Sequence, residues 1–135
     1  MLRALPRRRS GFTLVELVVV VLVLGILAAV AAPRVMNTAT TAKSNGTRQS
    51  LVVIRNAIEY YRSENGAFPP AATFAAALKP YLKGPFPAAQ IGNLNADVAS
   101  TTSSPITTPV AGGAGWAYNA STGEFVVNHA DGIVW

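Results

Sequence analysis

Apolar residues fill one long stretch near the start of the chain. From Phe12 to Ala32 there are 21 residues, and the only polar side chains among them are those of Thr13 and Glu16. A helix of about 20 apolar residues is long enough to cross the hydrocarbon core of a bilayer. The pattern therefore predicts a membrane-spanning helix over residues 12–33. A carboxylate is costly in such a segment, so Glu16 by default marks a function and requires a partner.

A second apolar pattern follows a polar stretch. Apolar residues return at spacings of three, four and three, which place them on one face of a helix. They are Leu51, Ile54, Ile58 and Tyr61. Ion pairs of Arg55 with Glu59 and of Glu59 with Arg62 are expected on another face, and Gly66 supplies the left-handed residue that ends a helix. We expect one helix from residue 12 to about residue 64.

Gly25, Pro33 and Gly46 are the weak points of this predicted helix. Proline in a helix interior removes a hydrogen bond and clashes with the preceding turn, so Pro33 should bend or locally melt the helix. The chain is then expected to divide into four parts. These are a leader (1–11), a transmembrane and assembly helix (12–33), an amphipathic helix that continues into the globular domain (34–66), and a loop-rich region with a C-terminal sheet (67–135).

The C-terminal part combines short apolar segments with loops. A short helix is expected over 73–79, capped by Thr73 and stopped by Pro80. Residues 83–115 are rich in Gly, Pro, Ser and Thr, which is typical of a long surface loop without packed structure.

Three short segments near the end are predicted to form strands. Residues 116–119 and 124–128 flank a turn, and residues 133–135 add a third strand. Because two strands alone are only marginally stable in water, the sheet needs the apolar face of the predicted helix packed against it. The predicted fold class is α+β, with a long N-terminal helix, half apolar and half amphipathic, packed on a small antiparallel sheet.

Basic residues are concentrated at the start of the chain. The formal charge is +5, but four arginines lie in residues 1–11, and the remainder holds seven basic and six acidic groups. We interpret residues 1–11 as a targeting leader. Basic residues beside an apolar span stay on the cytoplasmic side, which places everything after Pro33 across the membrane. A near-neutral body lacks the clustered positive face that nucleic acid requires, so no nucleic-acid partner is expected.

Few groups are suited to catalysis. The chain has no cysteine and one histidine, His129, which we interpret as a surface residue. No grouping of His, Cys and acids has a workable spacing, so no enzyme is expected.

Two further sets of residues each allow two interpretations. Four aromatic residues are interpreted as the core of the sheet, with a sugar-binding platform as the alternative: Trp116, Tyr118, Phe125 and Trp135. Three arginines are interpreted as a solvated helix face, with intersubunit ion pairs as the alternative: Arg48, Arg55 and Arg62.

The residues from Gly11 to Glu16 (Gly-Phe-Thr-Leu-Val-Glu) follow basic residues and precede an apolar helix that has Pro33 at its far end. This segment resembles the class III signal of type IV pilins and pseudopilins. The resemblance implies that a prepilin peptidase cuts between Gly11 and Phe12 and methylates the new amino terminus of Phe12. It also implies that Glu16 meets the Phe12 amine of a neighbouring subunit during assembly of a pilin-like homopolymer.

A second stretch, from Tyr60 to Pro69, is similar to the helix end of type II secretion major pseudopilins. The absence of cysteine also fits that branch. It implies partners in the secretion machinery: minor pseudopilins, an inner-membrane platform protein and an assembly ATPase. Such pseudopilins often bind calcium through an acid-rich loop, but beyond Glu64 this chain has only three acids, so calcium is left open and no cofactor is expected. The weak metal candidates are Asp97 and Asp131.

The main prediction is therefore the major pseudopilin of a type II secretion system. It would be held in the bacterial inner membrane by a single span, in contact with lipid before assembly, and then enter a periplasmic or extracellular filament. One alternative is a true type IV pilin for adhesion, motility or DNA uptake. The other is an exported soluble binding module with a cleaved signal peptide, since residues 29–31 look like a small-residue cleavage site. Glu16 argues against that module because an acid early in the apolar region hinders plain export.

Overall fold

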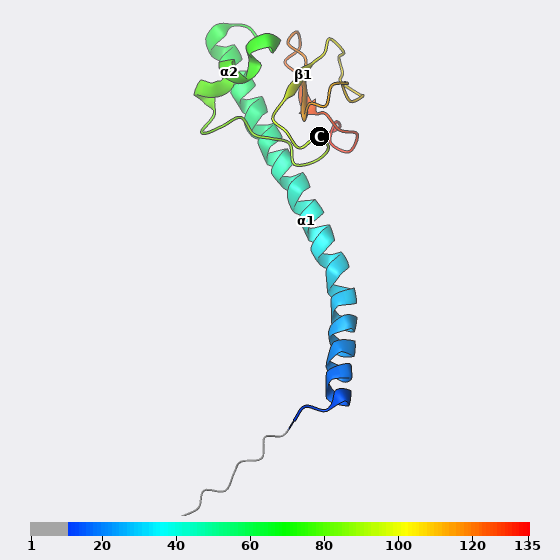
Figure 1. Ribbon diagram of the computed structural model, residues 1–135. Helices are drawn as coiled ribbons and strands as arrows, with labels where there is room; N and C mark the ends of the chain where they lie inside the picture. Colours follow the sequence, from blue (N-terminus) through cyan, green and yellow to red (C-terminus); the bar gives the residue numbers. More distant parts are fainter. Residues whose placement is uncertain (1–10) are drawn as a thin grey trace, which may run out of the picture. The chain divides into compact units, whose positions relative to one another are not determined.

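The computed structural model describes residues 11–135, and the predicted leader therefore lies outside the described residues apart from Gly11. Helix α1 spans Leu14–Asn65 and is followed by short helices and a three-stranded sheet (Figure 1). The predicted α+β class is confirmed. The chain consists of two compact units, and the boundary between them falls within α1, between Ala39 and Thr40.

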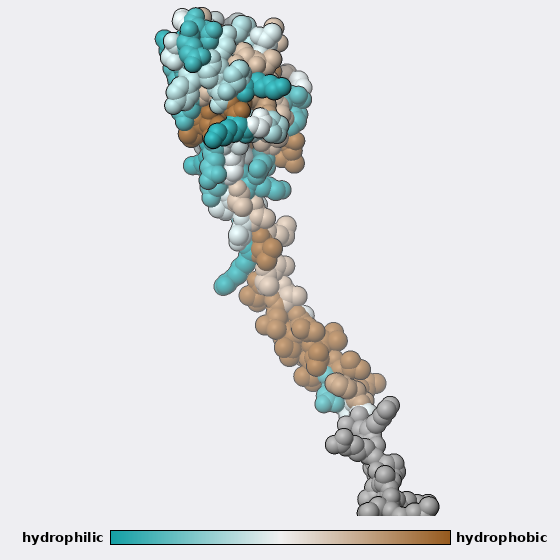
Figure 2. Space-filling view, turned by 90° about the vertical axis from the view of Figure 1, so that its left-hand side faces the viewer, coloured by the Kyte–Doolittle hydropathy of each residue, from teal (hydrophilic) through white to brown (hydrophobic). Residues whose placement is uncertain are grey.

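The unit before Thr40 consists of the first half of α1. An 18-residue window of the helix has a mean hydropathy of 3.0, and none of it is buried in the protein, so α1 is apolar and long enough to cross a membrane. Figure 2 shows hydrophobic residues covering this part of the helix. The helix continues through Pro33, so the predicted local melting does not occur. A bend at Pro33 stays a prediction.

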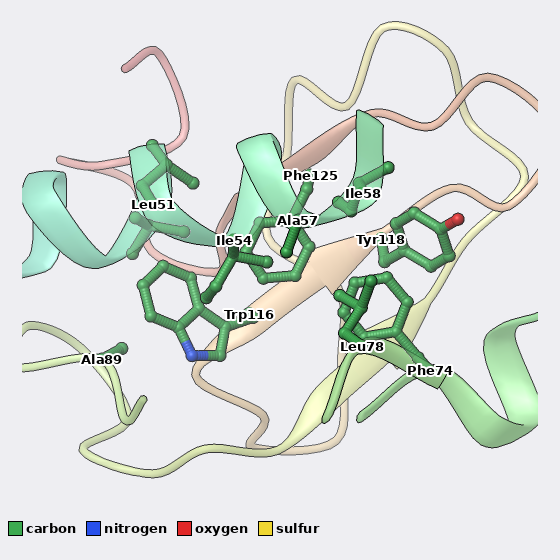
Figure 3. Close-up of a cluster of buried hydrophobic side chains, with 11 residues drawn as sticks. Leu51, Ile54, Ala57, Ile58, Phe74, Leu78, Ala89, Trp116, Tyr118 and Phe125 are labelled. Atoms are coloured by element: carbon green, nitrogen blue, oxygen red, sulfur yellow. The ribbon is translucent and has the colours of Figure 1, made fainter. Parts of the chain in front are cut away.

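The second half of α1 carries the apolar face of the domain. Four of its side chains, from Leu51, Ile54, Ala57 and Ile58, are almost fully buried, and they lie against the aromatic side chains of the sheet and of α2 (Figure 3). The helix ends as predicted, because the N–H of Gly66 donates to the carbonyl of Arg62 at 2.8 Å and Gly66 has a φ of 72°. Tyr61, the last residue of the predicted face, is half-buried.

Three short strands form the sheet in the order β1-β2-β3. They are β1 (Val98–Ser100), β2 (Trp116–Tyr118) and β3 (Phe125–Val127). Strands β2 and β3 pair antiparallel, with Trp116 opposite Val127, as predicted. Alternate side chains reach the two faces. Trp116, Tyr118 and Phe125 pack toward α1, whereas Ala117 and Val126 pack on the other face against Ile106 and Ile133.

The prediction of a purely antiparallel sheet with a third strand at 133–135 is wrong in two respects. The third strand is β1, which lies in the predicted surface loop (83–115). It pairs parallel to β2, which makes the sheet mixed. The 15-residue connection between β1 and β2 is long enough for the crossover that parallel pairing needs. Residues near 133 form a turn instead, in which the N–H of Ile133 donates to the carbonyl of His129 at 2.9 Å.

The predicted helix over 73–79 is divided into three pieces. Helix α2 (Phe74–Leu78) is flanked by the 3₁₀ turns η1 (Ala71–Thr73) and η2 (Lys79–Tyr81). Thr73 makes no side-chain capping bond, so its predicted role is wrong. Pro80 lies inside η2, which its fixed φ and missing N–H allow near the start of a helical turn.

The arginines at heptad spacing on α1 are not a merely solvated face. Arg55 donates to the carbonyls of Phe125 (2.9 Å) and Trp135 (2.7 Å), which leaves it unavailable for the predicted pair with Glu59. The guanidinium of Arg48 lies 4.2 Å from the ring centroid of Trp135. These arginines therefore attach the last residues of the chain and the β3 edge to α1.

Arg62 completes the heptad series. Its guanidinium lies 4.5 Å from the ring centroid of Phe68. Arg62 also lies 3.8 Å from the carboxylate of Glu59, which confirms the second predicted ion pair, and both side chains are exposed.

Candidate functional site at the start of α1

Thr13 and Glu16 form a reciprocal cap at the start of α1. Oε2 of Glu16 accepts hydrogen bonds from the backbone N–H and the hydroxyl of Thr13, both at 3.3 Å. In return, the N–H of Glu16 donates to Oγ1 of Thr13 at 3.2 Å. Because Thr13 precedes the first helical residue, this arrangement is a capping box. It explains why the helix begins at Leu14.

The cap gives the Glu16 carboxylate a favourable local environment. The first N–H groups of a helix have no partner within the helix, and they carry the positive end of the helix dipole. A carboxylate in the first turn satisfies one of them and interacts with that dipole. Among residues 11–135, Oε1 of Glu16 has no hydrogen-bond partner. The carboxylate can therefore receive a further donor without breaking the cap.

Gly11 and Phe12 precede the cap and are both exposed. Phe12 exposes 76% of its surface. A Cβ atom added to Gly11 would meet no atom within 4 Å, so packing in the described chain does not require a glycine there.

The structure does not bring the other predicted candidates into this site. Asp97 and Asp131 are exposed residues of the C-terminal domain, and Nδ1 of His129 lies 3.5 Å from the Asp131 carboxylate. No group of three or more His, Asp or Glu side chains that could hold a metal ion occurs in residues 11–135. The described residues thus give no support to a calcium site.

The capping role of Thr13 was missing from the sequence-based prediction. The signal was present, since Thr13 and Glu16 match the pattern of a Ser or Thr followed three residues later by an acid, directly before an apolar run. Glu16 was interpreted as a charge within the membrane that needs the Phe12 amine of a neighbouring subunit as its partner, and that interpretation leaves out its local use as a cap.

Comparison with known proteins identifies the same segment. Residues 6–32 match the family described as "Prokaryotic N-terminal methylation motif", a range that holds the end of the basic leader, the capping box and the apolar run. Together with the α+β fold, this match confirms the predicted resemblance to the pilin and pseudopilin family.

Curated relatives narrow the comparison to one branch. The chain is 43% identical over 63 residues to type II secretion system core protein G of Pseudomonas aeruginosa, a match that covers 47% of this chain and 44% of that protein. It is 38% identical over 63 residues to core protein G of Aeromonas hydrophila, covering 47% and 44%. The Escherichia coli protein of the same name is 32% identical over 68 residues, covering 50% and 46%. The chain thus spans about half the length of the curated relatives it matches, and no solved structure matches it significantly.

Proposed function

We propose that this protein is the major pseudopilin of a type II secretion system, a structural subunit that is cut after Gly11 and polymerises through α1. The single observation that carries the proposal is the methylation motif over residues 6–32, which contains the start of an unburied apolar helix whose first turn holds one acid. The relatives named core protein G support the secretion branch. The subunit has no catalytic task of its own.

Cleavage between Gly11 and Phe12 would create the charged partner that Glu16 needs. The new α-amine of Phe12 is cationic, and N-methylation keeps that charge. Residues 1–11 would act only as a leader that presents this bond to a prepilin peptidase at the cytoplasmic face of the membrane. The apolar helix (12–33) would then remain in the bilayer, with lipid as its first partner.

Assembly would pair Glu16 of one subunit with the Phe12 amine of its neighbour. The capping box already holds the carboxylate in place, and Oε1 is available for a further donor. An amine and a carboxylate that both lie in a poorly solvated region favour pairing over isolation. The pair would set the register between adjacent apolar helices, while the residues after Pro33 carry the domain outside the cytoplasm.

The filament would be a homopolymer with a core of apolar helices. Burial of the exposed side chains of residues 12–32 against other copies would replace their contact with lipid. An ATPase, an inner-membrane platform protein and minor pseudopilins would supply energy and initiation. The amphipathic helix (34–66) and residues 67–135 would form the outer surface of the filament, outside the inner membrane.

Mass spectrometry of the mature protein tests this proposal. The expected product starts at N-methylated Phe12, and it retains the whole apolar helix. A mature chain that starts near Ala32 would overturn the proposal and support an exported soluble module. Long extracellular fibres on cells would instead support the alternative of a surface pilin for adhesion, motility or DNA uptake.

A further inference from the structure

A groove runs along the outer side of α1 in the C-terminal domain. It consists of two adjoining hollows, of about 380 and 490 Å³, that share Gln49 and Val53. One hollow continues from α1 onto the segment after η2, where Leu82 and Pro85 line it. The side chains of Val52 and Val53 are 55% and 51% exposed, so the domain leaves the apolar floor of this α1 groove uncovered.

The charges around the α1 groove have one sign. Arg48 and Lys83 line it, and no acidic residue among residues 11–135 does so. Lys83 makes no ion pair within the described chain. An apolar floor with an unpaired cation at its rim is the pattern of a protein interface whose partner brings an apolar side chain and an acid.

The same domain presents such a side chain on a fixed loop. Leu94 is 65% exposed, and the residues on both sides of it are tied down. Asn93 donates to the carbonyl of Ala114 at 3.2 Å, and Asn95 donates to the carbonyl of Gly113 at 2.8 Å. Because the loop is already ordered, docking of Leu94 would cost little conformational entropy.

The close approach behind this loop depends on Gly115. The N–H of Gly115 donates to Oδ1 of Asn95 at 2.6 Å, and the N–H of Asp97 donates to the same atom at 3.2 Å. A Cβ atom at position 115 would clash with the backbone oxygens of Asn93 and Asn95. The loop is therefore built to hold Leu94 outward.

An unpaired acid accompanies Leu94. Asp97 is exposed, lies three residues after Leu94 and has no ion-pair partner among residues 11–135. Between residues 66 and 135, the other exposed large aliphatic residue is Val134, but the carboxylate of the nearby Asp131 already lies 3.5 Å from His129. Leu94 with Asp97 thus complements the α1 groove better than Val134 does.

We propose that Leu94 of one subunit docks in the α1 groove of a second copy of this chain, with Asp97 facing Lys83 of that copy. The contact joins two different patches, so each copy can use its loop toward one neighbour and its groove toward another. Used in this heterologous way, with a rotation that does not close, the contact repeats into the open helical array that the proposed homopolymer requires. This inference rests on the proposed homopolymer and names a contact between its outer domains.

Cysteine cross-linking in the full-length, processed protein tests the contact. The natural chain has no cysteine, so every thiol is an introduced one. A chain with both Leu94→Cys and Val53→Cys should form a ladder of dimers, trimers and larger species on mild oxidation. Each copy then carries one thiol in the loop and one in the groove, so it can be cross-linked to two neighbours. Each single variant should stay monomeric. The matched control is Leu94→Cys with Thr108→Cys, a second exposed position outside the groove, which should give no ladder.

Charge reversal gives a second readout. Lys83→Asp or Asp97→Lys, added to the cysteine pair, should each lower ladder formation by up to about fivefold, and the two together should restore it. An equal ladder from the control pair, or dimers from Val53→Cys alone, would overturn the contact. If the natural chain sediments as a polymer and the cysteine pair still gives no ladder, only this contact is wrong. If the natural chain is processed but never polymerises, both the contact and the proposed function fail.

Discussion

Oε2 of Glu16 lies 3.3 Å from both the backbone nitrogen and the hydroxyl oxygen of Thr13. The acid within the apolar run therefore has a structural task in the single chain, before any neighbour is present. That local task and the proposed intermolecular ion pair require different properties of the side chain. A cap needs a hydrogen-bond acceptor, whereas the ion pair needs a negative charge.

Glu16→Gln separates these two tasks. Glutamine can complete a capping box but carries no charge, so the helix start should be retained while assembly is lost. A charge-assisted hydrogen bond contributes about 1.5–3 kcal/mol, and its loss should reduce the association constant between subunits by roughly 10- to 100-fold, which lowers the polymerised fraction. Sedimentation of detergent-solubilised membranes measures that fraction, and the mass of the subunit reports processing.

Glu16→Ala is the matched comparison. It removes the cap as well as the charge, which should cost about 1 kcal/mol of additional helix stability. Its assembly defect should nevertheless resemble that of Glu16→Gln. Normal polymer from Glu16→Gln would show that the cap alone explains the acid, and it would contradict the pairing with the Phe12 amine.

Gly11→Val should block processing and leave the domain folded. A side chain at Gly11 meets no atom within 4 Å in the described chain, so the substitution disturbs no packing. Bulk next to the cleaved bond should prevent its entry into the peptidase site, and the precursor should accumulate with residues 1–11 attached. Intact mass measures the outcome. Gly25→Val, a substitution inside the apolar helix with equally open surroundings, serves as the control and should be processed normally.

Periodicity predicted the elements whose contacts are local or set by one face of a helix. The face from Leu51 to Ile58, the helix end at Gly66 and the β2–β3 hairpin are each specified within a few residues of sequence. Strand β1 was missed because three residues in a segment rich in Ser, Thr and Pro carry no alternating pattern, and their pairing is set by β2.

Long-range side-chain contacts were equally invisible in the sequence. Arg55 reaches carbonyls 70 and 80 residues away along the chain, and helical spacing cannot distinguish such a residue from a solvated arginine. The signal motif at the start of α1 was easier to recognise, because the residues from Gly11 to Glu16 are contiguous. The reciprocal cap of Thr13 and Glu16 could also have been predicted from these residues.

Arg55→Met should destabilise the domain by about 2 kcal/mol. The substitution keeps the apolar stem but leaves the carbonyls of Phe125 and Trp135 without their charged donor, and bonds to charged groups contribute about 1.5–3 kcal/mol. For a domain of this size the midpoint of thermal unfolding should fall by roughly 10 °C. Tryptophan fluorescence during heating measures it.

Arg62→Met is the control for that loss. Arg62 lies over the ring of Phe68 and pairs with Glu59 at an exposed position, where such contacts contribute about 0.5–1 kcal/mol. An equal loss of stability in the two variants would show that the bonds from Arg55 to the carbonyls of Phe125 and Trp135 contribute no more to stability than the exposed contacts of Arg62.

Tyr118 should make the stability of the domain depend on pH in the alkaline range. The residue is fully buried, and its hydroxyl donates to the carbonyl of Pro69 at 2.9 Å. Burial raises the pKa of Tyr118 to about 12 from an ordinary value of 10.0, and the charge of Tyr61 acts in the same direction. Only the unfolded chain ionises Tyr118 between these values, so its contribution is complete below pH 10 and is lost as the pH rises towards 12.

Tyr118→Phe should remove this part of the pH dependence. A difference of about two pKa units corresponds to roughly 2–3 kcal/mol across that range. At neutral pH the same variant should be about 1–2 kcal/mol less stable, because the buried carbonyl of Pro69 loses its donor. Urea unfolding at pH 8 and pH 11.5 gives both quantities. A natural chain as stable at pH 11.5 as at pH 8 would contradict the raised pKa of Tyr118. Tyr118 would then have to ionise in the folded chain at the same pH as in the unfolded chain.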